Sequence, residues 1–309
     1  MTILGKANET AKGIVWIASY PRSGNTWTRA FLNALATVSH DPEATAIDIN
    51  RIEEGSVAED LAELYPRFLN KPTALASPAE IAAARPWVQA ALADSAGRTI
   101  YVKTHNARGF DHGAPLINMG ASLGAVYIVR NPLDVAISYA HLNGMEIDTA
   151  ISWMGAPGWR TPARSDRGTA KVHVVMGSWS ENVASWTEPS HPAVLVIRYE
   201  DILADPVASL TRVARHLLLK APPRLVARAV ELTRFDRLRA QEDATGFSER
   251  PRRSDEAFFR SGRAGQWRDH LSEAQVARIV ADHGTLMQRF GYLPEQMTGE
   301  SKTARATRA

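Results

Sequence analysis

The fold is decided by residues 14–27, which read IVWIASYPRSGNTW. Residues 14–18 have the length and apolar composition of a buried strand in a parallel sheet. A polar loop follows, and its Gly24 lets the backbone approach an anion closely. Apolar residues at helical spacing begin directly after it, at Trp27. A strand, a tight loop and a helix start predict a cradle for phosphate, although an ordinary turn is the competing interpretation.

The loop also carries the side chains that a phosphate group needs. Arg22 offers a fixed positive fork, and hydroxyl and amide donors come from Ser23, Asn25 and Thr26. The loop lacks the arrangement of a Walker A sequence, GxxxxGK[ST], in which four residues separate a first glycine from a Gly-Lys pair. This difference weakens an ATPase or GTPase interpretation.

Two downstream segments predict further anion contacts. Residues 127–141 read YIVRNPLDVAISYAH, in which a strand over 125–129 precedes a helix with Pro132 in its first turn. Arg130 at the strand end and Ser138 about two helical turns later can converge on one anion. Residues 258–267, FFRSGRAGQW, add Arg260 in a segment rich in glycine.

A possible catalytic pair follows another predicted strand. Residues 99–104 read TIYVKT and precede His105, so Lys103 and His105 project to the same side of the chain. They lie at the carboxyl edge, where open parallel sheets bind ligands. An imidazole near its ordinary pKa of about 6.5 can accept a proton near neutral pH. A fourth strand, over 194–201, places Tyr199 at its end, unless Arg198 and Tyr199 begin a helix instead.

In this order, the segments resemble those of the sulfotransferases that use PAPS (3′-phosphoadenylyl sulfate). YPRSGNTW is similar to the family's phosphosulfate loop YPKSGTTW, and FFRSGRAGQW to its FxRKGxxGxW segment. The family also has a KTH sequence where this chain has Lys103 to His105. The resemblance covers residues 14–270 and implies a P-loop-type parallel sheet flanked by helices, an α/β fold.

The resemblance implies a role for each candidate residue. His105 would deprotonate the acceptor hydroxyl, while Lys103 and Arg22 would stabilise the sulfuryl group and the departing phosphate oxygen. The implied PAPS contacts are Arg22, Ser23, Gly24, Asn25, Thr26, Trp27, Arg130, Ser138, Tyr199, Thr233, Phe235, Arg260, Ser261 and Gly262. Among these, Arg130 and Ser138 would hold the 3′-phosphate, and Trp27, Tyr199, Thr233 and Phe235 would surround the adenine. No metal ion is implied.

Two residues depart from the family pattern, in which lysines are usual at the places of Arg22 and Ser261. Arginine is a poor proton donor, so Arg22 would stabilise the leaving group only by its charge. Ser261 removes one positive charge, for which the nearby Arg263 can substitute.

Composition agrees with a large enzyme domain. The chain has 309 residues, of which 45% are hydrophobic, and we expect one domain over 1–297 with a disordered tail over 298–309. A net charge of +3 is too small for general nucleic-acid binding. The chain has no cysteine, signal-peptide pattern or apolar run of membrane-spanning length, so we expect a cytoplasmic protein without membrane contact.

The acceptor side is less defined. Helices are expected near 57–64 and 78–92, and a long loop over 143–171 is either a lid or a disordered insertion. Residues 177–186, GSWSENVASW, are similar to a helix of the family. The dimerisation sequence of animal members has no counterpart at Ser272, Glu273 and Ala277, so the oligomeric state stays open.

The favoured function is transfer of a sulfuryl group from PAPS to a hydroxyl of a small-molecule or natural-product acceptor. A P-loop nucleoside or sugar kinase is the second interpretation, and it would require Mg²⁺ and a Walker lysine. A non-catalytic nucleotide-binding protein is the third, motivated by Arg22 and Ser261. His105 beside Lys103 argues against the third, because a protein that only binds needs no base there.

Overall fold

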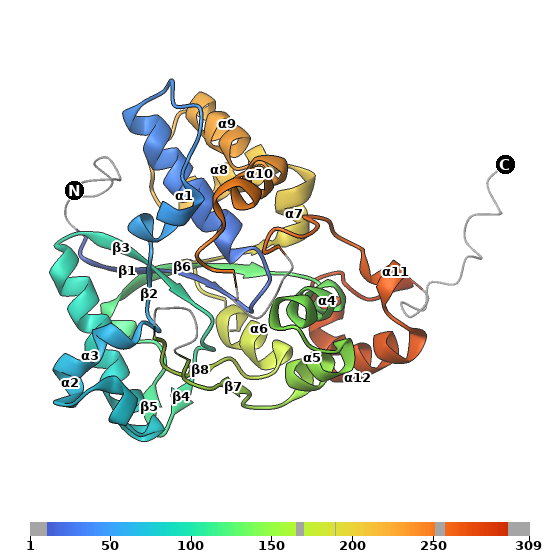
Figure 1. Ribbon diagram of the computed structural model, residues 1–309, viewed down its shortest axis with the longest axis horizontal. Coiled ribbons are helices and arrows are strands. Elements are labelled where there is room, and N and C mark those ends of the chain that lie inside the picture. Colours follow the sequence, from blue (N-terminus) through green and yellow to red (C-terminus); the bar gives the residue numbers. More distant parts are fainter. Residues whose placement is uncertain (1–10, 165–169, 189, 251–256, 296–309) are drawn as a thin grey trace.

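A five-stranded parallel sheet forms the centre of the computed structural model, which describes residues 11–164, 170–188, 190–250 and 257–295 (Figure 1). The strand order is β2-β3-β1-β6-β9, and every pairing is parallel. The strands are β1 (Gly13–Ser19), β2 (Val57–Ala58), β3 (Thr99–Thr104), β6 (Ser122–Val129) and β9 (Val194–Arg198). The predicted α/β fold is confirmed.

Helices cover both faces of this sheet (Figure 1). The helices are α1 (Asn25–His40), α2 (Pro66–Leu69), α3 (Pro78–Ala96), α4 (Pro132–Asn143), α5 (Ile147–Gly155), α6 (Trp179–Thr187), α7 (Tyr199–Ala204), α8 (Pro206–His216), α9 (Pro223–Leu232), α10 (Phe235–Thr245), α11 (Trp267–His270) and α12 (Glu273–Arg289). Two small antiparallel pairs accompany them, β4 (Phe110–Asp111) with β5 (Ala114–Pro115) and β7 (Arg160–Thr161) with β8 (Val174–Val175).

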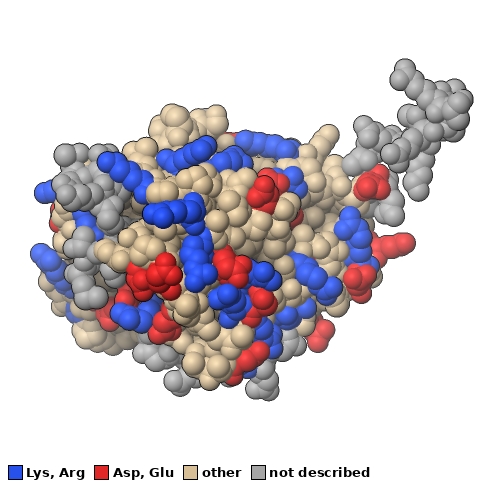
Figure 2. Space-filling model, turned by 90° about the horizontal axis from the view of Figure 1, so that it is seen from above, with Lys and Arg blue, Asp and Glu red and all other residues tan. Residues whose placement is uncertain are grey.

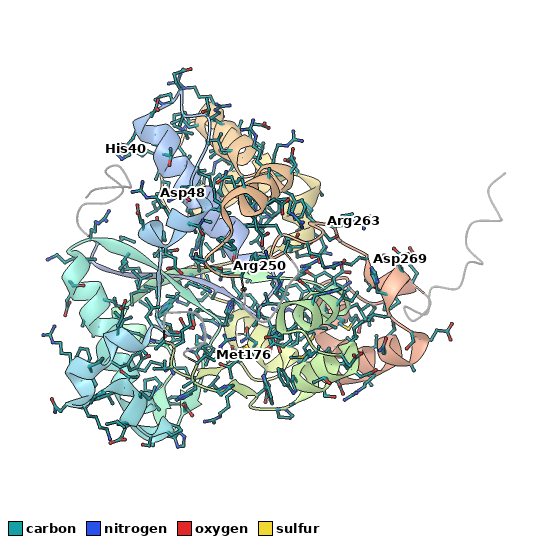
Figure 3. The ribbon with its side chains drawn as sticks, in the orientation of Figure 1. His40, Asp48, Met176, Arg250, Arg263 and Asp269 are labelled. Atoms are coloured by element: carbon teal, nitrogen blue, oxygen red, sulfur yellow. The ribbon has the colours of Figure 1, made fainter. Side chains whose placement is uncertain are left out.

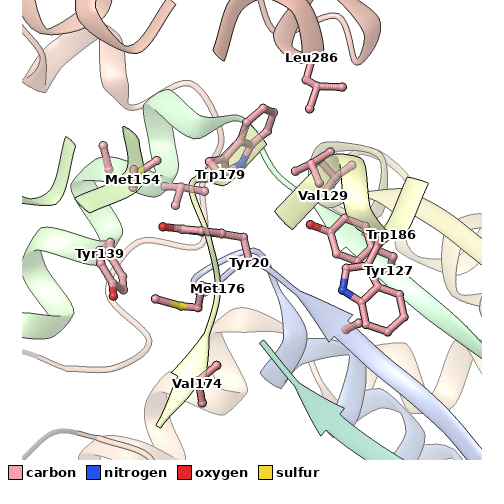
Figure 4. Packing of buried hydrophobic residues seen from close by; sticks show 14 of the residues in the cluster. Tyr20, Tyr127, Val129, Tyr139, Met154, Val174, Met176, Trp179, Trp186 and Leu286 are labelled. Carbon is pink, nitrogen blue, oxygen red and sulfur yellow. The ribbon is translucent and has the colours of Figure 1, made fainter. Parts of the chain in front are cut away.

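Strand β1 is buried along its whole length and separates two hydrophobic cores. Because successive side chains of a strand point to opposite faces, Trp16 enters one core, while Val15 and Ile17 enter the other. In the core of Trp16, Tyr20 lies between Trp179 and Met176 (Figure 4). The second core includes residues of α1, α8 and α9. This two-sided burial explains why the strand is an uninterrupted apolar run.

The carboxyl ends of four strands bring the candidate residues to one edge of the sheet. The loop 20–24 leads from β1 to α1, and His105 follows β3. Arg130 follows β6 and precedes α4, and Tyr199 follows β9. Strand β9 ends at Arg198, so Tyr199 begins helix α7 instead of extending the strand as one interpretation expected.

The region 41–98 contains one of its two predicted helices. The prediction over 78–92 is confirmed by α3, which starts with a capping box formed by Ser77 and Glu80. The prediction over 57–64 is wrong, because Val57 and Ala58 pair with β3 at the edge of the sheet and only a short 3-10 turn, Ala62–Leu64, follows. Hydrogen bonding to a neighbouring strand outweighed the weak helical propensity of this short segment.

The segment 143–171 is ordered where the structure describes it. It contains α5 and β7, and Trp153 stacks on Trp159 with ring centroids 4.6 Å apart. Residues 165–169 of this segment lie outside the described residues, and so does the tail 298–309, for which we expect disorder. The predicted helix over 177–186 is confirmed by α6.

Candidate active site

A cavity of about 940 Å³ opens at the carboxyl edge of the sheet. Its lining includes Arg250 and Met176, which lie near the middle of the molecule (Figure 3). The predicted site residues that line it are Arg22, Gly24, Asn25, Thr26, Trp27, Lys103, His105, Arg130, Ser138, Tyr199, Phe235, Arg260, Ser261 and Gly262. Ser23 and Thr233 are fully buried and do not line it. The fold therefore gathers nearly all the predicted residues in one place.

Gly24 shapes the loop at the start of α1. Its φ is 102°, and a Cβ at this position would lie 2.8 Å from the Tyr199 ring. Asn25 ties the loop to β1, because its Nδ2 donates to the Ile17 carbonyl at 2.9 Å. The buried Ser23 Oγ and Asn25 Oδ1 have no hydrogen-bond partner among the described residues. Buried polar atoms of this kind fit a loop made to receive a polar ligand.

Arg22 points toward Ser138. Its Nε donates to Ser138 Oγ at 2.8 Å and its Nη2 to the Phe258 carbonyl at 3.0 Å, with the guanidinium 4.4 Å from the Phe258 ring. Burial and the charges of Arg130 and Arg260 lower the pKa of Arg22 to about 10. Arg22 therefore stays charged at neutral pH.

Arg130 lies between the loop and Tyr199. Its Nη1 donates to the Arg22 carbonyl at 2.9 Å, and its guanidinium lies 4.3 Å from the centre of the Tyr199 ring. Its Nε is buried without a hydrogen-bond partner among the described residues. The positive charges of Arg22, Arg130 and Arg260 repel one another, and a bound anion would offset this repulsion. Arg22, Arg130 and Arg260 thus form a cluster suited to a highly charged anion.

Asp134 holds the glycine-rich segment over this cluster. The sequence places it in the first turn of α4, and its carboxylate accepts hydrogen bonds from Gly265 N at 2.7 Å and Trp267 N at 3.0 Å. Gly262 has a φ of 61°, and a Cβ there would overlap the Phe235 ring. Aromatic packing and a buried carboxylate therefore fix the path of this segment.

The predicted adenine contacts lie together. Trp27 donates from Nε1 to the Thr233 carbonyl at 2.9 Å and meets the Tyr199 ring edge-on at 6.0 Å. Phe235 packs edge-on against Phe259 at 6.5 Å. Thr233 thus contributes its backbone to positioning Trp27.

His105 is held in one tautomer. Its Nδ1 lies 2.8 Å from the Ser19 carbonyl, and since a carbonyl can only accept, Nδ1 carries the proton and Nε2 the free lone pair. Burial and the Lys103 charge lower the pKa of His105 to about 3, far below the value of about 6.5 expected from the sequence. Burial also lowers the pKa of Lys103 to about 8. The pair is a neutral base beside a cation.

A buried network fixes the chain around His105. Glu59 accepts hydrogen bonds from the side chains of Thr104 and Asn106, the residues on either side of His105. Asn182 of α6 donates to the His105 carbonyl at 3.1 Å. The position of the imidazole is therefore set by Ser19, Glu59 and Asn182, which come from three separate parts of the chain.

Sequence reasoning missed several charged residues of the cavity. Glu249 accepts hydrogen bonds from Thr26 and Arg29, and Asp60 pairs with Lys171 at 3.0 Å. Arg29 was not detectable, because helical spacing places it on the side of the predicted helix opposite Trp27, Ala34 and Val38. Glu249 carries no local signal, since its partner Arg29 is 220 residues away in the sequence.

The far side of the cavity is mainly apolar. Tyr139, Met145 and Met176 line it together with the stacked Trp153 and Trp159.

In the described residues there is no group of three or more His, Asp or Glu side chains placed to hold a metal ion. Within the same part of the chain, no helix is both long and apolar enough to cross a membrane. On the face in Figure 2, basic and acidic side chains are interspersed.

Comparison with known proteins gives a consistent result. A family model described as "Sulfotransferase domain" matches residues 12–291. Sulfotransferase 1A1 of Canis lupus familiaris is 25% identical over 89% of this chain and 83% of its own length. Sulfotransferase 1A1 of Bos taurus is 27% identical over 88% and 82% of the two chains.

The fold also has solved counterparts. The structure of retinol dehydratase with androsterone and inactive cofactor PAP aligns with a TM-score of 0.58 at 20% identity, covering 94% of this chain and 85% of that one. At this identity the likeness concerns the fold.

Proposed function

The chain belongs to the sulfotransferase family, and we propose that it transfers the sulfuryl group of PAPS to a hydroxyl group of a small-molecule acceptor. One observation carries the proposal. A neutral imidazole, the Lys103 cation and a cluster of arginines open into the same cavity. A protein that only bound a nucleotide would need the arginines but not a base held in one tautomer.

The donor site fits PAPS, which carries about four negative charges. Arg130, Ser138, Arg260 and the Ser261–Gly262 backbone would hold the 3′-phosphate. The loop 22–26, at the N-terminus of the 16-residue helix α1, would hold the 5′-phosphosulfate. Ser23 Oγ and Arg130 Nε, which have no hydrogen-bond partner in the described part of the chain, support this assignment. Trp27, Tyr199 and Phe235 would contact the adenine. Bound PAPS supplies a sulfuryl group attached to a phosphate leaving group.

His105 would accept the proton of the acceptor hydroxyl at Nε2. The Ser19 carbonyl keeps Nδ1 protonated, so the accepting nitrogen is fixed before the acceptor arrives. Negative charge brought into the cavity by the donor would raise the pKa of His105 from its low value toward the working range. Lys103, and Arg22 by its charge, would stabilise developing negative charge in the transition state.

The apolar far side supports an acceptor with an apolar body. Trp153, Trp159 and Tyr139 offer ring surfaces, and a hydroxylated natural product fits this lining.

We further propose that residues 1–297 form one domain, because both cores pack on the same sheet. The absence of cysteine supports a cytoplasmic location.

Calorimetry with PAP, the nucleotide product, and with ATP tests the donor class. We expect PAP to bind more tightly than ATP, without any requirement for Mg²⁺. A metal-dependent preference for ATP would overturn the proposal in favour of a kinase. A panel of hydroxylated acceptors incubated with labelled PAPS would then identify the acceptor and show whether an O-sulfate ester forms.

A further inference from the structure

Glu249 joins three parts of the candidate site. One carboxylate oxygen, Oε1, accepts from Arg29 Nη1 at 2.7 Å and lies 3.9 Å from Lys103 Nζ. The other, Oε2, accepts from Thr26 Oγ1 at 3.0 Å. Only 12% of the side chain is exposed. A single carboxylate thus connects the phosphate loop, helix α1 and the lysine at the end of β3.

A carboxylate is an unexpected group in a cavity made for anions, because it repels the ligand. Pairing with Arg29, whose side chain is completely buried, explains part of its presence. That pairing needs no contact with the phosphate loop or with Lys103. Although burial opposes ionisation, the charges of Arg29 and Lys103 hold the pKa of Glu249 well below its usual range. Glu249 is therefore ionised throughout the physiological range.

We infer that Glu249 is a positioning residue that keeps Lys103 charged and directed at the phosphate loop, an inference that rests on the proposed function. The carboxylate reaches Lys103 from the segment 247–250, which lines the cavity. Through Thr26 it also fixes the loop relative to the lysine. Glu249 itself would touch neither of the reacting groups.

The charges around Lys103 make this dependence strong. Burial disfavours its charged form, and Lys171 and Arg29 oppose it further. Glu249 and Asp60 favour the charged form, and His105 on the same strand end is neutral. Glu249 is the larger of the two favourable charges. Without it, Lys103 would lose its proton at a lower pH.

The first test is Glu249→Gln, which is nearly isosteric but uncharged. We expect the pKa of Lys103 to fall by about one unit or more, measured by NMR of lysine-labelled protein with Lys103→Arg to assign the signal. With labelled PAPS, kcat/KM at pH 8 should fall about fivefold and recover toward pH 6, since a fall from 8 to 7 leaves about one fifth as much charged lysine. Glu54→Gln, at an exposed carboxylate paired with Arg51, is the matched control.

Two further variants test the inference if Glu249→Gln folds poorly. Glu249→Asp keeps the charge, so the titration of Lys103 should stay near that of the wild type. Arg29→Met removes an opposing charge and should raise the pKa of Lys103, a change of opposite sign. Loss of activity at every pH, with an unaltered Lys103 titration, would show that Glu249 only supports the fold and would overturn the inference.

These outcomes are separable from failure of the proposed function. The NMR titration of Lys103 needs no substrate, so it tests the coupling even if the wild type does not use PAPS. A wild type without PAP binding would refute the proposed function. If the wild type transfers sulfate but the pKa of Lys103 is the same in Glu249→Gln, only the inference is refuted.

Discussion

At the scale of single residues, burial changes the chemistry that the residue types suggest. His105 is a histidine whose surroundings keep it neutral, with its proton fixed on the nitrogen that faces Ser19. Arg22 reaches Ser138 and not Lys103, so its guanidinium lies with Arg130 and Arg260. The roles proposed for both residues depend on these neighbours, and that of His105 leads to two predictions.

Replacing His105 with alanine should abolish transfer and leave PAP binding almost unchanged. General acid–base catalysis contributes about 10²- to 10⁴-fold, so kcat should fall by that order. The arginine cluster is untouched, so the calorimetric Kd for PAP should change less than about twofold. Loss of PAP binding in a folded variant would instead show that His105 supports the donor site.

The pH profile of kcat/KM should show no decline from protonation of a histidine near pH 6.5, about the usual pKa of that side chain. A lowered pKa means that the imidazole stays unprotonated as the pH falls, down to about pH 3 in the free enzyme. Between pH 7 and 5, kcat/KM for PAPS, which reports the enzyme before the donor binds, should therefore not decline through His105. An NMR titration of the free enzyme in which the His105 imidazole changes protonation near pH 6.5 would contradict this assignment.

Gly24→Ala should be much more damaging than a matched glycine replacement. The left-handed backbone and the Tyr199 ring at 2.8 Å both oppose a side chain, so we expect a loss of about 2–4 kcal/mol in the free energy of unfolding. Gly97 has a φ of 61° but open space around it, so Gly97→Ala measures backbone strain alone. Equal losses in urea denaturation would show that contact with Tyr199 is unimportant.

At the scale of elements, local signals succeeded where they were strong. The helical pattern over 78–92 and the proline in the first turn of α4 correspond to real helices. The segment 143–171 illustrates the opposite case, because glycine and proline suggested a loop while tertiary contacts order α5 and pair β7 with β8. The stacked Trp153 and Trp159 belong to this segment and face the cavity.

Trp159→Ala should weaken acceptor binding specifically. Stacked aromatic pairs contribute about 0.5–1.5 kcal/mol beyond burial, so the acceptor KM should rise about two- to tenfold or more. The donor Kd should not change, because Trp159 packs against the core on one face of the sheet and Trp27 against the core on the other. Trp87→Ala is a suitable control, since that side chain on α3 is 66% exposed. A parallel loss of PAP affinity would place Trp159 in the donor site.

At the scale of the whole molecule, the cavity concentrates positive charge that the net charge of +3 conceals. Repulsion among Arg22, Arg130 and Arg260 is part of the folded state and is relieved by a bound anion. Ligands that neutralise this cluster should therefore stabilise the entire fold.

PAP should raise the melting temperature more than AMP, which lacks the 3′-phosphate. At a ligand concentration about 100 times Kd, binding adds about 2.7 kcal/mol to stability. The difference between PAP and AMP should shrink at high salt, because salt screens the attraction between the 3′-phosphate and the arginine cluster. Equal shifts from the two nucleotides in a thermal melt would argue against a 3′-phosphate site.

The sequence by itself determined four of the five strands of the sheet and the order of its ligand-binding loops. Buried parallel strands are continuous apolar runs, and glycine, proline and polar residues mark the loops between them, so both signals are local. Only the tertiary structure decided that Arg22 contacts Ser138, that His105 is neutral and that Glu249 reaches Lys103. These properties arise from burial and from charges distant in the sequence, and neither is encoded in any short stretch of residues.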